Sequence, residues 1–105
     1  MMAGGHGTGR RTVRAVVRGR VQGVGFRAWT RSQAELHGLD GWVRNRRDGT
    51  VETVLAGDPE AVGAMLVALR QGPRGCRVDA VEMSEADEKA VGPRPVGEFA
   101  VLGTI

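Results

Sequence analysis

Residues 41–56, GWVRNRRDGTVETVLA, contain two runs rich in β-forming residues, 41–46 and 50–56, on either side of Arg47-Asp48-Gly49. An Asp-Gly pair between two such runs is typical of a tight hairpin turn. We therefore predict that the two runs form neighbouring antiparallel strands. This hairpin argues against a parallel sheet, in which consecutive strands are joined by long crossover connections.

The segment before the hairpin predicts a strand, a loop and a helix. Apolar and charged residues partly alternate over residues 12–18, as expected of a half-buried strand. Residues 19–25 contain three glycines and predict a loop. Residues 26–37 contain neither Gly nor Pro and precede Gly38, a natural helix C-cap, so they predict the first helix.

The segment after the hairpin predicts a second helix and two further strands. Asp58 is a suitable N-cap, and Pro59 suits the first helical position. Residues 76–83 predict a strand whose apolar phase changes near Asp79-Ala80, which indicates a β-bulge, and residues 98–102 predict a short closing strand. The apolar stripe of the second helix, spaced i, i+3, i+4 and i+7, consists of Val62, Met65, Leu66 and Leu69.

These elements follow the order β-α-β-β-α-β with one additional strand. The order predicts an α+β fold, the ferredoxin-like split βαβ sandwich, with an antiparallel sheet and two helices on one face. Residues 1–11 contain four glycines and no hydrophobic periodicity, so we expect a flexible Gly-rich tail before a single domain over residues 12–105. Because this plan serves both binding and catalysis, function must be inferred from the site.

Composition limits the kinds of site that the chain can build. Residues 1–47 carry ten arginines and two acids, whereas residues 48–105 carry five basic and ten acidic groups, so we expect an anion to bind in the first part. Cys76 is the only cysteine, and His6 lies far from His37, so neither a disulfide nor a metal site is expected. No run of about 18 apolar residues and no secretory signal is recognisable, which predicts a cytoplasmic protein without a membrane partner.

The loop before the first helix predicts an anion-binding site. Gly19, Gly23 and Gly25 allow positive φ angles and a close approach of the backbone to a ligand. A helix N-terminus adds free N–H donors and the positive end of the helix dipole, which favours phosphate. Arg27, on the first turn, has a planar guanidinium that suits bidentate binding of phosphate oxygens. The alternative is a Gly-rich turn without a ligand.

Two other ligands fit parts of the sequence less well. Residues 23–28 also fit the dinucleotide pattern G-x-G-x-x-A, but that site needs a parallel sheet of repeated crossover units. Trp29 and Trp42 raise the possibility of base stacking, yet the run 50–55 lacks the aromatic residues of an RNA-binding sheet. We expect both tryptophans to pack in the core or at its edge, and no nucleic-acid partner.

Residues 19–27, GRVQGVGFR, resemble the phosphate-binding signature of the acylphosphatase family. Residues 41–45, GWVRN, followed by residues 48–52, DGTVE, resemble the second signature of that family. The resemblance runs from about residue 13 to residue 81 and is weaker beyond. His37, where the family usually has an apolar residue, is expected at a helix end. Cys76, where the family usually has a small residue, is expected to be a buried, inert thiol.

The resemblance implies an enzyme that hydrolyses the carboxyl-phosphate bond of small acyl phosphates and releases inorganic phosphate. Asn45 would orient the attacking water, and Arg27 would hold the phosphoryl group. No metal and no cofactor are implied, and a monomer is expected. The non-enzymatic alternative is a module that binds a phosphorylated ligand without turnover. The backbone amides implied in phosphate binding belong to Gln22, Gly23, Val24, Gly25, Phe26 and Arg27.

Overall fold

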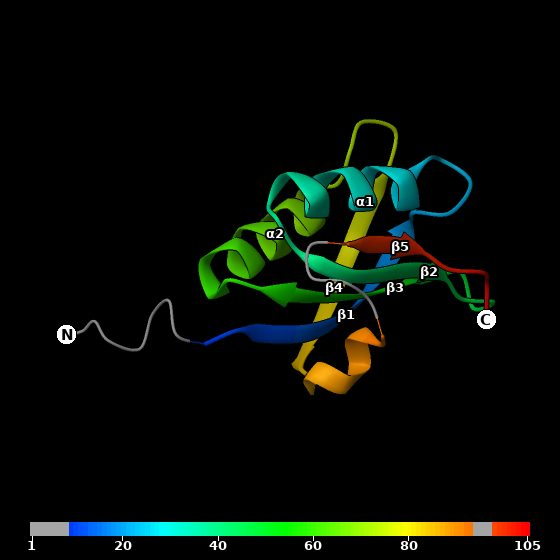
Figure 1. Cartoon of the computed structure of the whole chain (residues 1–105). Coiled ribbons are helices and arrows are strands. Elements are labelled where there is room, and N and C mark those ends of the chain that lie inside the picture. Colours follow the sequence, from blue (N-terminus) through cyan, green and yellow to red (C-terminus); the bar gives the residue numbers. More distant parts are fainter. Residues whose placement is uncertain (1–8, 94–97) are drawn as a thin grey trace.

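The computed structural model describes residues 9–93 and 98–105. They form a five-stranded sheet in the order β4-β1-β3-β2-β5, with helices α1 and α2 on one face and the 3-10 helix η1 on the other (Figure 1). This is the predicted α+β arrangement of the ferredoxin-like type. The bounds are β1 (Arg11–Arg20), α1 (Phe26–Leu36), β2 (Asp40–Asn45), β3 (Val51–Gly57), α2 (Pro59–Gln71), β4 (Arg77–Glu85), η1 (Glu88–Val91) and β5 (Phe99–Val101).

The predicted hairpin is confirmed. β2 and β3 pair antiparallel from Asp40 opposite Ala56 to Asn45 opposite Val51. In the turn between them, the Oδ1 of Asp48 accepts hydrogen bonds from the backbone N–H of Thr50 at 3.0 Å and from its hydroxyl at 2.6 Å. A side chain that bonds to the backbone two residues ahead stabilises a turn. The turn therefore gives Asn45, the last residue of β2, a well-defined position.

The predicted bulge is also confirmed. Beyond it, Gly19 and Arg20 still pair with β4, so β1 ends at Arg20 and not at the expected Arg18. β1 pairs with β4, and the register shifts so that Arg18 faces Ala80 while Gly19 faces Val78. Asp79 is the additional residue. Gly19 has a φ of 135°, and a Cβ there would overlap the carbonyl oxygen of Arg77. Gly19 thus belongs to the sheet, which corrects its assignment to the phosphate loop.

Both helices begin and end where the capping residues predict. Asp58 caps α2 by accepting hydrogen bonds from the N–H groups of Glu60 and Ala61, and Pro59 is its first residue. α1 ends in a Schellman motif, in which Gly38, with a φ of 69°, donates to the carbonyl of Glu35. The four residues of the predicted α2 stripe are all buried.

β5 completes the sheet by pairing with β2 in parallel, so the sheet is mixed, although its four longer strands are antiparallel as predicted. This topology contains no series of βαβ crossovers within the described residues. The dinucleotide alternative is therefore rejected, because its site lies in a doubly wound parallel sheet.

Two apolar clusters lie on opposite faces of the sheet. The larger one joins the sheet to both helices and includes Phe26, with the partly buried Trp29 against it at 5.4 Å between ring centroids. The smaller one holds Trp42 under η1, where its Nε1 donates to the carbonyl of Ala90 at 2.7 Å. Both tryptophans are packing residues, as expected, and Trp42 offers no open face for a base.

The described chain begins just before β1, and the expected tail lies mostly outside it. His6 belongs to residues 1–8, which lie outside the described part. Arg11 is the first residue of β1, and the guanidinium of Arg10 bonds to Asp40 at 2.9 Å and to Glu88 at 2.7 Å. No helix among the described residues is long and apolar enough to cross a membrane.

Candidate functional site

A cleft of about 230 Å³ lies between the loop after β1 and the end of β2. It brings together residues that stand far apart in the sequence, because the sheet places β1 and β2 on either side of β3. Five of the seven residues predicted for the site line it. The lining consists of Val21, Gly23, Gly25, Phe26, Arg27, Ala28, Asn45 and Val101.

The loop owes its shape to two glycines. Gly23 has a φ of 75° and Gly25 a φ of 83°, both in the left-handed region that other residues rarely adopt. A Cβ at either position would meet no atom within 4 Å, so the requirement for glycine comes from the backbone conformation and not from crowding. Val21 and Phe26 are buried in the core and anchor both ends of this loop.

The N-terminus of α1 presents backbone donors toward the cleft. The first hydrogen bond of the helix runs from the N–H of Trp29 to the carbonyl of Gly25, at 3.0 Å. Gly25 supplies no side-chain cap, and the first turn holds no acidic residue. The preceding amides therefore stay available, and the positive end of the helix dipole is not offset by a carboxylate. This is the arrangement that binds an anion.

Among the described residues that line the cleft, only Arg27 has a charged side chain. Its side chain is partly buried, and no carboxylate among the described residues forms an ion pair with it. The guanidinium thus keeps all of its donors for a ligand. A planar fork beside free amides suits a tetrahedral oxyanion.

Asn45 forms the opposite wall. Its Oδ1 is buried, and no group in the described part of the chain donates a hydrogen bond to it. A buried acceptor without a partner is costly, so such an atom in a native protein needs an explanation. Asn45 also lines the cleft, so its amide is a candidate for a polar contact with a water or ligand that enters there.

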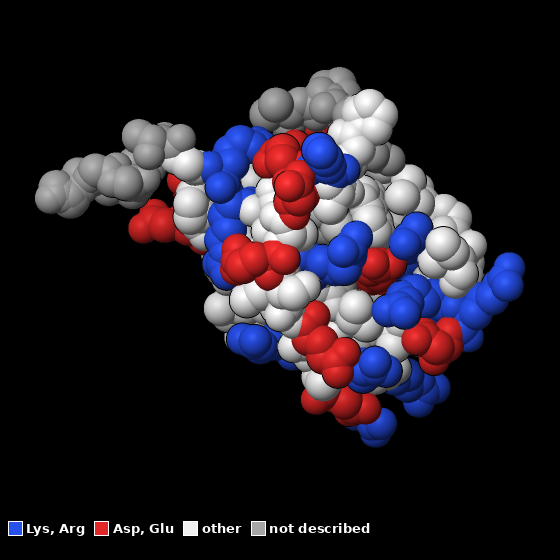
Figure 2. All heavy atoms as spheres, turned by 90° about the horizontal axis from the view of Figure 1, so that it is seen from below, with Lys and Arg blue, Asp and Glu red and all other residues white. Residues whose placement is uncertain are grey.

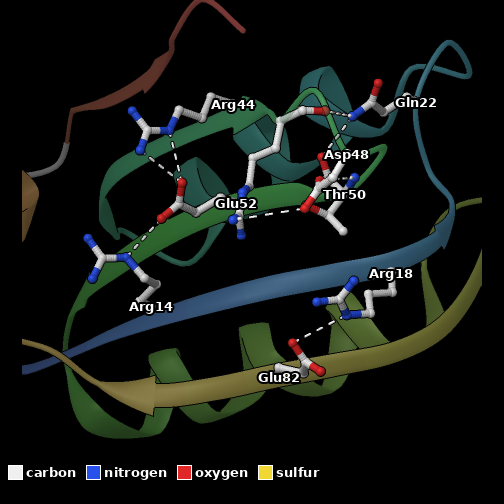
Figure 3. Close-up of polar contacts among 9 residues, drawn as sticks. Arg14, Arg18, Gln22, Arg44, Asp48, Thr50, Glu52 and Glu82 are labelled. Atoms are coloured by element: carbon white, nitrogen blue, oxygen red, sulfur yellow. Dashed lines mark hydrogen bonds and ion pairs between the residues drawn. The ribbon is translucent and has the colours of Figure 1, made fainter. Parts of the chain in front are cut away.

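Gln22 and Val24, both predicted to bind phosphate through their amides, do not line the cleft. The side chain of Gln22 instead reaches the β2–β3 turn, as Figure 3 shows. Its Nε2 donates to the carbonyl oxygens of Arg46 and Thr50, each at 2.7 Å.

Most of the other arginines are neutralised by acids from the second half of the chain. Figure 2 shows basic and acidic side chains interleaved on the sheet face opposite the long helices. There the carboxylate of Glu52, which is 10% exposed, lies 2.9 Å from both Arg14 and Arg44 (Figure 3). Arg18 pairs with Glu82 in the same way, at 3.3 Å. Ion pairs therefore balance much of the basic excess of residues 1–47. Arg20, Arg27 and Arg47 have no ion pair among the described residues, and of these three only Arg27 lines the cleft.

His37 and Cys76 lie outside the cleft lining. The Nδ1 of His37 lies 2.8 Å from the carbonyl oxygen of Gln33, at the end of α1 as expected. Cys76 is partly buried against the main core, and burial raises the pKa of its thiol above the ordinary value. A raised pKa keeps the thiol protonated and unreactive.

Sequence reasoning missed three apolar residues of the lining: Val21, Ala28 and Val101. The first two adjoin the glycine loop and were within reach of a local argument. Val101 was not, because only the parallel pairing of β5 with β2 brings it there. In the part of the chain that the structure describes, no group of three or more His, Cys, Asp or Glu is placed to hold a metal ion.

Several acylphosphatases are among the known proteins that resemble this chain. The acylphosphatase family model matches residues 13–94. An acylphosphatase of Rhodopseudomonas palustris (strain BisB5) is 52% identical over 96 residues, which cover 90% of this chain and 97% of that protein. The structure of an acylphosphatase from Coxiella burnetii aligns with a TM-score of 0.80 and 30% identity, covering 94% of this chain and 99% of that one. The crystal structure of acylphosphatase from Bacillus subtilis aligns with a TM-score of 0.77 and 32% identity, covering 87% of this chain and 97% of that one.

Proposed function

Because the chain belongs to the acylphosphatase family and is a hydrolase of acyl phosphates, we propose that the cleft between the glycine loop and Asn45 is its active site. One observation carries this assignment. An uncapped helix N-terminus with a free Arg27 shares one small cleft with Asn45, whose buried Oδ1 has no donor among the described residues. An acceptor for water opposite an anion site is what hydrolysis of a phosphate compound requires.

The loop amides from Gln22 to Arg27 and the guanidinium of Arg27 would bind the phosphoryl group. The left-handed conformations of Gly23 and Gly25 support this role, because both residues line the cleft and carry no side chain that could separate the backbone from a ligand. In phosphoryl transfer, negative charge is spread over the equatorial oxygens of the transition state. Fixed N–H donors and a guanidinium stabilise this charge without having to reorganise during the reaction.

Asn45 would orient the attacking water. Its Oδ1 accepts a hydrogen bond from the water, whose oxygen attacks phosphorus as the bond from phosphorus to the acyl oxygen breaks. The bonding pair leaves with the acyl oxygen as a carboxylate, and the water proton passes to a phosphate oxygen, so the products are carboxylate and inorganic phosphate. A carboxylate is a good leaving group, so the step needs no general acid. An amide cannot serve as a base, which leaves positioning as its contribution.

We propose that this chemistry uses neither a metal nor a cofactor. The described residues of the cleft lining include no carboxylate, imidazole or thiol, the side chains that hold most catalytic metals. Turnover should be the same before and after treatment with EDTA. Loss of turnover in EDTA that a divalent cation restores would contradict the proposal.

We further propose that the protein acts as a monomer in the cytoplasm, without nucleic-acid or membrane partners. The edge strand β4 carries charged residues, including Arg77, Asp79 and Glu82, which disfavour edge-to-edge pairing. The single free thiol of Cys76 is compatible with a reducing compartment. Sedimentation equilibrium would test the monomer, and cell fractionation would test the location.

The proposed activity is tested by phosphate release from benzoyl phosphate and, in parallel, from an ordinary phosphomonoester. Rapid release from benzoyl phosphate alone is expected, since the site offers no group to protonate a poor leaving group. Equal rates on both would indicate a general phosphatase. Binding of inorganic phosphate without turnover of either substrate would favour the alternative, a phosphate-binding module.

A further inference from the structure

Gln22 makes a direct polar link between the two walls of the cleft. Its single amide nitrogen donates one hydrogen bond to the carbonyl of Arg46 and one to the carbonyl of Thr50, both at 2.7 Å (Figure 3). The acceptors lie 24 and 28 residues further along the chain, so no local structure requires these bonds. Among the described residues, no other side chain of the loop 21–25 bonds to the hairpin.

The turn that receives these bonds is already closed by its own backbone. The carbonyl of Arg46 also accepts from the N–H of Gly49 at 3.1 Å, and the carbonyl of Thr50 accepts from the N–H of Arg46 at 2.9 Å. A carbonyl oxygen can accept two hydrogen bonds, and here Gln22 takes the second place on each. Its bonds are therefore not needed to form the turn, but they tie the loop to it.

The position of this link relates it to the chemistry. Gln22 immediately precedes Gly23 in the loop, and Arg46 immediately follows Asn45. The link therefore attaches to each wall of the cleft one residue away from a residue that lines it. Both N–H donors of the Gln22 side-chain amide are used, so the side chain has none left for a phosphate oxygen.

We propose that Gln22 is a positioning residue, which sets the separation between the phosphate-binding loop and Asn45 and so aligns the attacking water with phosphorus. This inference rests on the function proposed above. The role of the Gln22 side chain is then distinct from that of the loop amides. The side chain affects the alignment of water and phosphorus, whereas the amides affect the affinity for phosphate. A small misplacement of reacting groups can cost on the order of 100-fold in rate.

Three variants test the proposal. Gln22→Met keeps the length of the side chain and removes both donors, whereas Gln22→Asn keeps the donors on a side chain too short to reach both carbonyls. Each should lower kcat on benzoyl phosphate by roughly 10- to 100-fold, while the inhibition constant of inorganic phosphate stays within about twofold. Gln71→Met, on the exposed end of α2, is the matched control and should change neither quantity. Thermal unfolding identifies folded variants, and Gln22→Asn serves alone if Gln22→Met does not fold.

A double-mutant cycle separates positioning from general support of the fold. In an Asn45→Ala background no side chain orients the water, so the Gln22 substitution should lower kcat little further. Losses that multiply, or a kcat near that of the wild type in the single variants, would overturn the proposal. Failure of the underlying function would look different: Asn45→Ala by itself would then leave kcat nearly unchanged.

Discussion

Arg27 differs from most arginines of the described chain in having no carboxylate partner. Its neighbour one turn further along α1, Arg31, pairs with Glu35 at 3.3 Å and is half exposed. The two residues thus carry the same charge on the same helix, but Arg31 is paired with a carboxylate and Arg27 is not. This contrast provides a matched pair of positions for testing the site.

Replacing Arg27 should remove an interaction made with both substrate and transition state. Arg27→Ala should weaken inhibition by inorganic phosphate and lower kcat on the order of 10³-fold or more. Arg27→Lys should restore little, because a point charge does not reproduce the bidentate fork. Arg31→Ala is the control and should leave both quantities unchanged. Steady-state kinetics with phosphate as a competitive inhibitor provides the measurement, and near-normal turnover in Arg27→Ala would refute the site assignment.

Asn45 should respond differently, because its proposed partner is the water. Asn45→Ala should lower kcat by roughly 10²- to 10³-fold, as does the loss of one preorganised polar group in other active sites. The inhibition constant of phosphate should stay near that of the wild type. If phosphate affinity fell as much in Asn45→Ala as in Arg27→Ala, the water-orienting role would be excluded.

Helix α2 has strong signals at its start, but its interior contains a residue that lowers helix stability. Asp58 and Pro59 begin it, and the apolar stripe anchors it to the sheet. Gly63 lies in its interior, where a Cβ would meet no atom within 4 Å. Glycine in a helix costs backbone entropy on folding, so this position lowers stability without a visible packing reason.

Gly63→Ala should therefore raise the free energy of unfolding by about 0.5–1 kcal/mol and leave turnover unchanged. Gly38→Ala is the matched counterpart, since a Cβ there also meets open space but the φ is 69°. It should lower stability by about 1 kcal/mol, because a side chain disfavours the left-handed region. Urea unfolding of both variants measures the difference, and changes of the same sign would contradict this explanation.

Across the whole molecule, ion pairs connect the arginine-rich first half to the acidic second half. Arg10 and Arg11 join the start of the sheet to Glu88 and Glu85. Hydrogen bonds from Arg10 and from the hydroxyl of Thr12 lower the pKa of Glu88 below its ordinary value. The hydrogen bond from Arg11 lowers the pKa of Glu85 in the same way.

These lowered pKa values predict a loss of stability in acid. A carboxyl group whose folded pKa lies below its unfolded pKa stabilises the fold above the unfolded value, near 4.5 for Glu88, and loses that contribution as the pH falls through the folded value. Glu88→Gln should thus be less stable than the wild type at pH 7, by about 1 kcal/mol or less, and the difference should shrink below about pH 4. Glu98→Gln, at an exposed position, is the control. Urea unfolding at pH 7 and pH 3 gives both values, and a difference independent of pH would contradict the prediction.

The beginning of the chain should be separable from the chemistry. We expect a protein that starts at Gly9 to retain the kcat and stability of the full chain, because residues 1–8 have no core-forming composition. A protein that starts at Arg11 should keep its kcat but lose some stability, since it lacks the bonds of Arg10 to Asp40 and Glu88. Turnover and thermal unfolding distinguish the two. A large fall in kcat in either folded protein would show that the tail takes part in the site.

The order of elements, their boundaries and several details could be predicted because they depend on short-range patterns. Apolar periodicity located the strands and the α2 stripe, capping residues located the helix ends, and the Asp48-Gly49 pair located the hairpin. The phase change near Asp79 even located the bulge. Each of these signals acts within a few residues, so the chain carries it locally. Arg27 was a candidate because it lies on the first turn of a predicted helix after a Gly-rich loop, whereas Asn45 was implied only by the resemblance to a family. The roles of both remain predictions.

Tertiary structure decided which of these local features meet. Gly19 belongs to a close contact between β1 and β4, and its sequence position beside the other loop glycines concealed this. The availability of Arg27 depends on where every acid of the second half lies in space. The bonds of Gln22 to a turn more than 20 residues away, like the arrival of Val101 in the cleft, follow from strand order alone. The sequence by itself therefore determined the elements and the types of residue available for chemistry. The pairing of strands determined which of these residues meet, because contacts between distant segments leave no periodic pattern in the sequence.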